Sequence, residues 1–259
     1  MKRLLCLVVV ILLMSSVSYG AEGQMGVYIA PKFVYGLTQM RNVNHKGIDE
    51  EDVNKGIPFT NYHIGNDTDN AFGGSFAIGY DFDKQYNIPI RTELEYSLFS
   101  KVKSERHYPL GYSIPGEMLT DDQTYKIQSL FLNMYWDIEN KTRFTPYIGG
   151  GIGVGFIKTG FGRHHYSVLD SSDSNWEEED RFRDWGKKTE TNFIWNLGVG
   201  VGYEVNDNWV VDLGYRFVNF GSIKTKTVTL IDDEGYRSGS VKTDHLYQHQ
   251  FSLGIRYTF

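Results

Sequence analysis

The sequence predicts an all-β fold, an eight-stranded antiparallel up-and-down transmembrane β-barrel. Three observations predict it. Apolar residues alternate with small or polar residues in eight segments, the connections between these segments are short and long in turn, and charges gather on the face opposite the aromatic residues. Because successive side chains of a strand point to opposite faces, each segment has one apolar face and one polar or small-residue face.

The composition excludes several other classes. With 41% hydrophobic and 22% charged residues, the chain is too well mixed for a disordered protein. A formal charge of −6 without a basic stripe argues against a nucleic-acid partner, and a single cysteine excludes a disulfide scaffold. After the first twenty residues no apolar run reaches 18 residues, which excludes a helical membrane protein.

Residues 1–20 have the pattern of a secretory signal peptide. Lys2 and Arg3 precede an apolar run of 11 residues, and Ser18 and Gly20 precede the expected cleavage before Ala21. The run is shorter than the roughly 20 residues that a membrane-spanning helix requires. We therefore expect an exported single domain over residues 21–259. It would contain no cysteine, and its 24 basic and 32 acidic residues would give a charge of −8.

The segment 192–205 is the clearest strand. Large apolar residues from Phe193 to Val205 share one parity, and Gly198, Gly200 and Gly202 lie on the other. A helix would be apolar on all sides and would lose about 1 kcal/mol for each glycine. In chain order, the apolar faces of the eight strands are expected to be Val27, Ile29, Phe33, Tyr35 and Leu37; Phe72, Phe76, Ile78, Tyr80 and Phe82; Ile90, Thr92, Leu94, Tyr96 and Leu98; Leu130, Leu132, Met134, Trp136 and Ile138; Ile148, Ile152, Val154 and Phe156; Phe193, Trp195, Leu197, Val199, Val201, Tyr203 and Val205; Trp209, Val211, Leu213, Tyr215 and Phe217; and Tyr247, Phe251, Leu253, Ile255, Tyr257 and Phe259.

The connections predict two unlike rims. Tight polar turns are expected at 83–89, 139–143 and 206–208, and long polar loops at about 41–69, 104–122, 160–190 and 221–243. Transmembrane barrels have short periplasmic turns and longer extracellular loops.

The alternative is a soluble eight-stranded barrel with an apolar interior. The charges favour the membrane barrel, because a soluble barrel would force wide aromatic residues into a narrow lumen. The side chains expected to form a charge network in the lumen are Lys32, Asp81, Arg91, Glu93, Glu95, Asp137, Glu204, Asp212, Arg216 and Arg256. We expect them to pair and close the lumen, because unpaired charges there would be costly. A narrow ion or proton path is the alternative.

Two parts of the chain resemble known bacterial proteins. The segment from Phe251 through Leu253, Gly254, Ile255 and Tyr257 to Phe259 resembles the C-terminal assembly signal of outer-membrane proteins. The glycine-rich stretch 144–155 and the segment 213–217 are similar to the opacity-type, OmpA-like eight-stranded surface proteins, which belong to the porin-type outer-membrane proteins. This resemblance implies a bacterial outer-membrane location and recognition of the last strand by the barrel assembly machinery.

The third long loop is the most distinctive. His164 and His165 precede an acidic run, but they point apart on an extended chain, so a metal site is disfavoured. Trp176, Phe182 and Trp185 lie among charges, as the aromatic residues of binding hot spots do, although packing on the barrel rim explains them equally well.

The function expected is that of a surface antigen or adhesin-like platform, in which the loops contact a host surface molecule or matrix and the wall contacts outer-membrane lipid. The alternatives are a structural or narrow-pore envelope protein and, less favoured, an enzyme at the rim. No nucleophile and base converge by spacing, since Ser240, His245 and His249 offer no catalytic set, so we expect neither an enzyme nor a cofactor.

Overall fold

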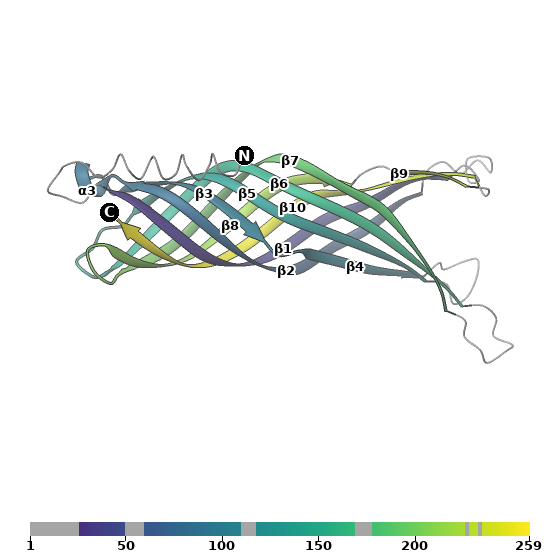
Figure 1. The fold of residues 1–259 in the computed structure, drawn as a ribbon, viewed down its shortest axis with the longest axis horizontal. Helices are drawn as coiled ribbons and strands as arrows, with labels where there is room; N and C mark the ends of the chain where they lie inside the picture. Colours follow the sequence, from purple (N-terminus) through teal and green to yellow (C-terminus); the bar gives the residue numbers. More distant parts are fainter. Residues whose placement is uncertain (1–25, 50–59, 110–117, 169–177, 226–227, 233–234) are drawn as a thin grey trace, which may run out of the picture.

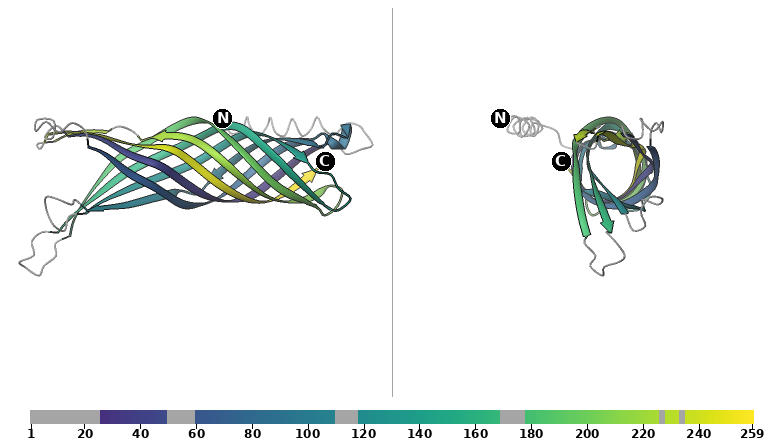
Figure 2. Two further views of the ribbon diagram at one scale, coloured as in Figure 1. Left: turned by 180° about the vertical axis from the view of Figure 1, so that it is seen from behind. Right: turned by 90° about the vertical axis from the view of Figure 1, so that its right-hand side faces the viewer.

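The structure, a computed structural model, describes residues 26–49, 60–109, 118–168, 178–225, 228–232 and 235–259. Nearly all of this part of the chain lies in one antiparallel sheet that closes into an elongated tube (Figures 1 and 2). The elements are β1 (Val27–Asp49), β2 (Thr60–Asp81), α3 (Asp83–Tyr86), β3 (Ile90–Phe99), β4 (Val102–Pro109), β5 (Met118–Asp137), β6 (Phe144–Val168), β7 (Glu178–Glu204), β8 (Trp209–Lys224), β9 (Val228–Asp232) and β10 (Gly235–Thr258).

The wall of the barrel has eight strands within the described residues. β4 continues the direction of β3 and pairs with β5, and β9 continues β8 and pairs with β10. Each strand otherwise pairs with its neighbours in the sequence, and the pairing of β1 with β10, from Tyr28 opposite Thr258 onward, closes the barrel. The predicted up-and-down barrel is therefore confirmed, and all eight predicted segments lie in its wall. No helix among the described residues has the length and apolar character needed to span a membrane.

The predicted faces are also confirmed. On β7 the side chains of Phe193 and Leu197 are 68% and 61% exposed, whereas those of Ile194 and Asn196 are buried in the lumen. Exposed Leu, Ile, Val, Phe and Trp side chains follow the same parity on the other strands. An apolar surface this extensive is untypical of a protein in water and is typical of the lipid-facing band of a membrane barrel.

The long connections differ from the prediction, because the strands continue through much of 41–69, 104–122, 160–190 and 221–243. β6 and β7, for example, remain paired out to Val168 opposite Glu178. In these segments, which we call the long hairpins, the backbone groups form hydrogen bonds between paired strands. Outside the membrane such strands need no apolar outer face. Apolar-outward alternation therefore could not reveal them.

At the other rim the connections are short, as predicted. Residues 139–143 and 206–208 are tight turns, and in the second the Asn206 side chain accepts bonds from the backbone amides of Asn208 and Trp209 at 3.0 and 2.9 Å. The connection 83–89 contains the single-turn helix α3, which is followed by the C-cap residue Asn87 with a positive φ of 50°. The C-terminal end of β10 lies at this same rim (Figure 1).

The lumen has two layers, and only the charged one was predicted from the sequence. The layer near the short turns is polar and contains the predicted charges. The layer near the long hairpins is an apolar core of buried side chains: Met40, Val43, Ala71, Val102, Tyr125, Ile127, Phe131, Ile157, Phe161, Ile194, Val218, Phe220, Ile223, Val241 and Leu246. The predicted inner face of polar and small residues therefore describes only the layer near the short turns.

The wall divides toward the long hairpins. The ladder between β7 and β8 ends at Trp195 opposite Asn219. The ladder between β2 and β3 ends at Gly73 opposite Phe99, followed by one more backbone bond from Ser100 to Phe72 at 2.7 Å. Beyond these points β8–β10, β1 and β2 form one lobe, and β4–β7 form a second lobe that diverges from the first (Figure 1).

Candidate functional site

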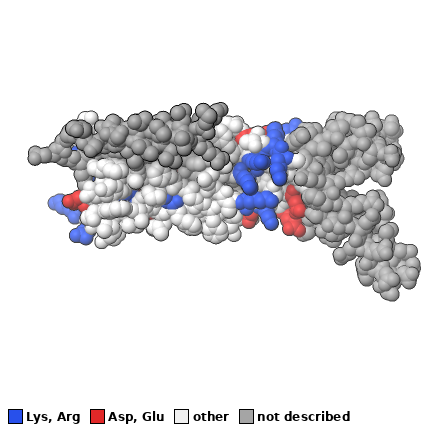
Figure 3. All heavy atoms as spheres, viewed as in Figure 1, with Lys and Arg blue, Asp and Glu red and all other residues white. Residues whose placement is uncertain are grey.

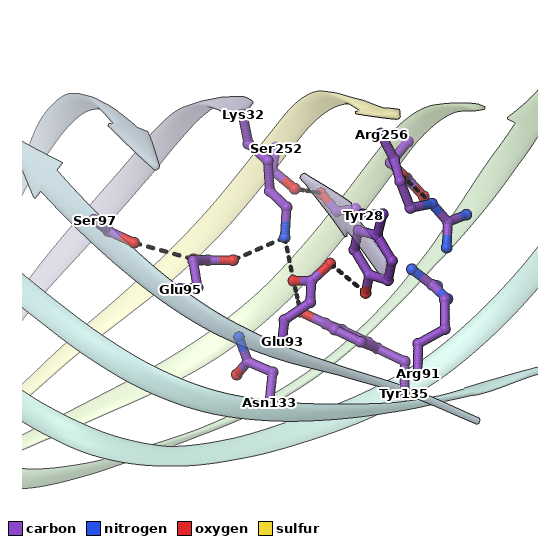
Figure 4. A network of polar contacts seen from close by, with 12 residues as sticks. Tyr28, Lys32, Arg91, Glu93, Glu95, Ser97, Asn133, Tyr135, Ser252 and Arg256 are labelled. Atoms are coloured by element: carbon purple, nitrogen blue, oxygen red, sulfur yellow. Dashed lines mark hydrogen bonds and ion pairs between the residues drawn. The ribbon is translucent and has the colours of Figure 1, made fainter. Parts of the chain in front are cut away.

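Two glutamates and one lysine form the centre of the polar layer in the lumen. Glu93 and Glu95 are neighbours on the inner face of β3, and Lys32 reaches them from β1. The Lys32 Nζ lies 2.6 Å from Glu93 Oε2 and 2.8 Å from Glu95 Oε2, so one ammonium group bridges both carboxylates (Figure 4). Tyr28 and Tyr135 donate hydroxyl hydrogen bonds to Glu93 at 3.0 and 3.2 Å. Lys32, Tyr28 and Tyr135 thus all donate to the Glu93 carboxylate, and such bonds favour its ionised form.

Glu95 is held from a second side. The Arg216 Nη2 on β8 lies 2.6 Å from Glu95 Oε1, and the Ser97 hydroxyl donates to the same oxygen at 3.0 Å. Arg216 Nε in turn donates to the Gln250 side chain at 2.5 Å, and Gln250 donates to Gln248 at 2.6 Å. This chain of bonds ties β3 to β8 and β10 across the lumen.

Arg91 makes the most regular ion pair. Its Nε and Nη2 donate to the two carboxylate oxygens of Asp137 at 2.5 and 2.8 Å, which is the two-bond geometry that arginine favours. Its guanidinium carbon also lies 5.1 and 5.0 Å from the ring centres of Tyr135 and Tyr147. Arg91 is 2% exposed, so these partners replace water around a buried cation.

The remaining predicted lumen residues differ in their contacts. The Arg256 Nε lies 3.5 Å from Asp212 Oδ2, and its guanidinium lies 5.4 Å from the Tyr28 ring centre. Asp81 is buried near the rim and accepts a bond from the backbone amide of Asp83. Glu204 is exposed at the rim of short turns, so the structure does not bring it into the network.

The arrangement favours closure over transport. In the described lumen, four cations are interleaved with five buried or half-buried carboxylates, and the apolar layer covers them on the side of the long hairpins. A small cavity of about 40 Å³ remains among residues that include Ser75, Arg91 and Asp212, which is room for a water or two. The two glutamates are both engaged by Lys32, so they are not arranged as an acid and base around an open cleft.

Sequence reasoning missed the neutral partners of the charges. Tyr28, Tyr135, Gln248 and Gln250 all lie in the network, but none carries a formal charge. Their parity on β1, β5 and β10 was the available signal, because a tyrosine or glutamine on the inward face must find a polar partner there.

The candidate binding residues of the third loop lie at the edge of what is described. Trp176 is outside the described residues. Phe182 and Trp185 belong to β7, but only their backbone is described. His164 and His165 lie on β6, where their backbones are opposite Phe182 and Arg181. Among the residues whose side chains are described, no group of acids, histidines or cysteines has the arrangement of a metal site.

The rim residues weighed for catalysis are not brought together. His245 is exposed and stacks on Tyr247, His249 lies on the outer face with Nδ1 2.8 Å from the Tyr215 hydroxyl, and Ser240 is buried. No hydrogen bond joins these three residues within the described part of the chain.

The C-terminal strand has the expected faces. Phe251, Leu253, Ile255 and Phe259 are exposed on the outer surface, where Tyr257 packs between Trp209 and Phe259. Gly254 faces inward beneath Lys32, and a Cβ atom there would lie 2.8 Å from Lys32 Cγ. The glycine thus makes room for the central lysine of the network.

A closed barrel with an apolar outer band, charges in its lumen and two unlike rims defines the class of bacterial outer-membrane β-barrels. The family model described as "Outer membrane protein beta-barrel domain" matches residues 7–259, and the chain belongs to this family.

The chain is 26% identical over 247 residues to the outer membrane protein PagN of Salmonella typhimurium, covering 92% of each chain. It is also 26% identical over 189 residues to the putative adhesin RC1281 of Rickettsia conorii, covering 72% of this chain and 67% of the relative. Among solved structures, Neisserial surface protein A matches with a TM-score of 0.45 and 17% identity, over 92% of this chain and all of that one.

Proposed function

We propose that the protein is an adhesin-like surface protein that binds a host surface molecule or matrix through its long hairpins. The observation that carries the proposal is the division of the molecule along its axis. The lumen is filled by ion pairs and an apolar core, whereas β6 and β7 continue as a paired ladder far beyond the last lipid-facing residues. A relative that aligns with 72% of this chain is named a putative adhesin, which supports the same role.

The β6–β7 hairpin is the proposed binding element, with Trp176, Phe182 and Trp185 as its contact residues. Aromatic residues among charges are typical of binding hot spots. The network of lumen charges is proposed to be structural and to close the barrel, and neither an enzyme activity nor a cofactor is proposed.

The test replaces residues 164–182, which include Trp176 and Phe182, by an Asn-Gly turn and adds Trp185→Ala. Arg163 lies directly opposite Arg183, so this replacement preserves the ladder up to that pair. The matched control shortens the β1–β2 hairpin in the same way by replacing residues 48–59, above Gly47 opposite Thr60. Both variants are expressed in a non-adherent bacterium, and attachment to cultured host cells is counted. We expect attachment to be lost only in the first variant; equal attachment of that variant and the unaltered protein would contradict the proposal.

Export and assembly are proposed to follow the expected signals. Cleavage before Ala21 is tested by N-terminal sequencing of the protein from outer membranes. Recognition by the barrel assembly machinery is tested by Phe259→Ala, which should lower the amount of folded protein in the outer membrane without changing the amount exported.

A further inference from the structure

A cluster of lysines covers the outer surface where the second lobe leaves the apolar band. Lys101 lies at the junction of β3 and β4, and Lys103, Lys126, Lys158 and Lys187 lie on β4 to β7. All five side chains are exposed, and we name them the lysine patch. Figure 3 shows basic side chains gathered in a band beyond the largely uncharged barrel surface, with a few acidic side chains beside them.

The strand register places these lysines in two rows. Lys126 on β5 is directly opposite Lys158 on β6. In the next row Lys103 is opposite Thr124, Thr124 is opposite Gly160, and Gly160 is opposite Lys187. Directly opposed side chains have Cβ atoms about 5 Å apart, so Lys126 and Lys158 are close neighbours, and Lys103 and Lys187 flank them on the two outer strands.

The carboxylates of the described residues do not pair with the ammonium groups of this cluster; Asp69 lies nearby, but it accepts a 2.7 Å hydrogen bond from the backbone amide of Lys103. Like charges directly opposite each other destabilise a sheet, yet no carboxylate in the described residues forms an ion pair with any of the five ammonium groups. Lysines elsewhere near this rim do have such partners, since Lys188 pairs with Glu190 at 2.5 Å and Lys242 with Asp244 at 2.7 Å. The exposed ammonium groups of the lysine patch are therefore accessible to water and to an anion from outside the chain.

The height of the patch indicates which kind of anion would meet it. Below Lys126 the outward residues of β5 are Gln128 and then the exposed Leu130, and below Lys158 the next outward residue of β6 is the exposed Phe156. Same-face neighbours on a strand are about 7 Å apart, so the lysines begin within one or two such steps of the hydrocarbon boundary. Long lysine side chains extend their charges from such a boundary toward polar head groups.

We propose that the lysine patch binds the phosphate groups of anionic lipid molecules in the outer leaflet of the outer membrane. The long hairpins identify this rim as the extracellular one. A basic residue near an anionic membrane surface raises affinity roughly fivefold. The outward acids Glu105 and Asp122 lie one row farther from the apolar band, where they would not face the phosphates. This lipid site on the wall is independent of the proposed adhesion through the hairpins.

The test measures binding of purified lipopolysaccharide to the full mature chain folded in detergent micelles. The variant is Lys101→Gln/Lys126→Gln/Lys158→Gln, and the control is Lys84→Gln/Lys141→Gln/Arg143→Gln, which removes three exposed basic groups at the opposite rim. Three fivefold factors give a loss of about a hundredfold, and with screening by salt we expect at least tenfold. The control should remain within twofold, and both variants should keep the heat-dependent gel shift of a folded barrel.

Dephosphorylated lipopolysaccharide identifies the ligand group. The unaltered protein should bind it more weakly by the same factor, and the patch variant should lose nothing further. Equal lipopolysaccharide affinity in the patch variant and its control would overturn the proposal. If the patch variant keeps its lipid affinity but loses binding of heparin, a soluble sulfated polysaccharide, the patch serves a polysaccharide and the lipid assignment is wrong.

Discussion

Glu95 is the residue whose change most sharply probes the lumen network. It is 1% exposed, and its carboxylate contacts Lys32 Nζ at 2.8 Å, Arg216 Nη2 at 2.6 Å and the Ser97 hydroxyl at 3.0 Å. Glu95→Gln keeps the shape of the side chain and removes its charge. Two cations then lose a shared anion inside a lumen that contains little water.

The expected loss follows from what each cation retains. Removing one partner of a buried ion pair costs about 3–5 kcal/mol. Lys32 keeps Glu93 at 2.6 Å and Arg216 keeps Gln250 at 2.5 Å, so we expect the lower end of that range, about 3 kcal/mol of unfolding free energy. Adding Arg216→Met should restore part of this loss, because the cation that lacks a partner is then removed.

The assay is urea unfolding of the barrel in phospholipid vesicles, followed by tryptophan fluorescence and by the gel shift between unboiled and boiled samples. Glu204→Gln is the matched control, since this exposed carboxylate should change stability by less than about 0.5 kcal/mol. If Glu95→Gln unfolds at the same urea concentration as Glu204→Gln, the network does not stabilise the barrel and our reasoning about it is refuted.

Three further predictions concern packing, the division of the wall and the closed lumen. Gly151→Ala should destabilise the barrel by about 1–3 kcal/mol, because its Cβ would lie 2.8 Å from Asn196 Nδ2, whereas Gly74→Ala should be tolerated with its nearest contact at 3.7 Å; urea unfolding of the pair checks this. Asn192→Ala removes two 2.8 Å hydrogen bonds to the β8 backbone and should raise amide hydrogen exchange in residues 220–224, which Thr191→Ala should leave unchanged. In planar bilayers the unaltered protein should form no discrete channels, and stable openings would contradict a closed lumen.

The part of the fold inside the membrane could be predicted from the sequence because lipid imposes a simple rule on it. Each strand must present apolar side chains outward and small or polar side chains inward, as Leu197 and Gly198 do on β7. That rule identified the eight strands and their order. It ended where the strands leave the lipid, and the hairpin strands beyond that point were taken for loops.

Beyond the membrane the alternation is reversed. On β5, Tyr125 and Ile127 face the lumen and Lys126 faces out, whereas Leu130 a few residues later faces lipid. On β6, Ile157 and Lys158 show the same reversal. Outside the lipid, apolar side chains are buried from water by the ordinary hydrophobic effect. The same residues therefore contain a signal for both the longer strands and the apolar core, in an apolar face that changes sides at the membrane boundary.

The candidate site was predictable in its charges and not in its partners. Parity placed Lys32, Glu93 and Glu95 on the inner face, but which ammonium meets which carboxylate depends on barrel closure and register. Arg216 and Glu95 are 121 residues apart in the sequence and meet only because β8 and β3 face each other across the lumen. No local spacing contains that information.

The orientation of the barrel is the central claim, and cysteine labelling on intact cells tests it most directly. The chain has one cysteine, Cys6 in the expected signal peptide, so single cysteines can be introduced without background from the mature domain. Glu105→Cys on β4 should react with a membrane-impermeant maleimide on intact cells, and Lys141→Cys in a short turn should react only after the outer membrane is permeabilised. Labelling of Lys141→Cys on intact cells, with Glu105→Cys protected, would contradict the account.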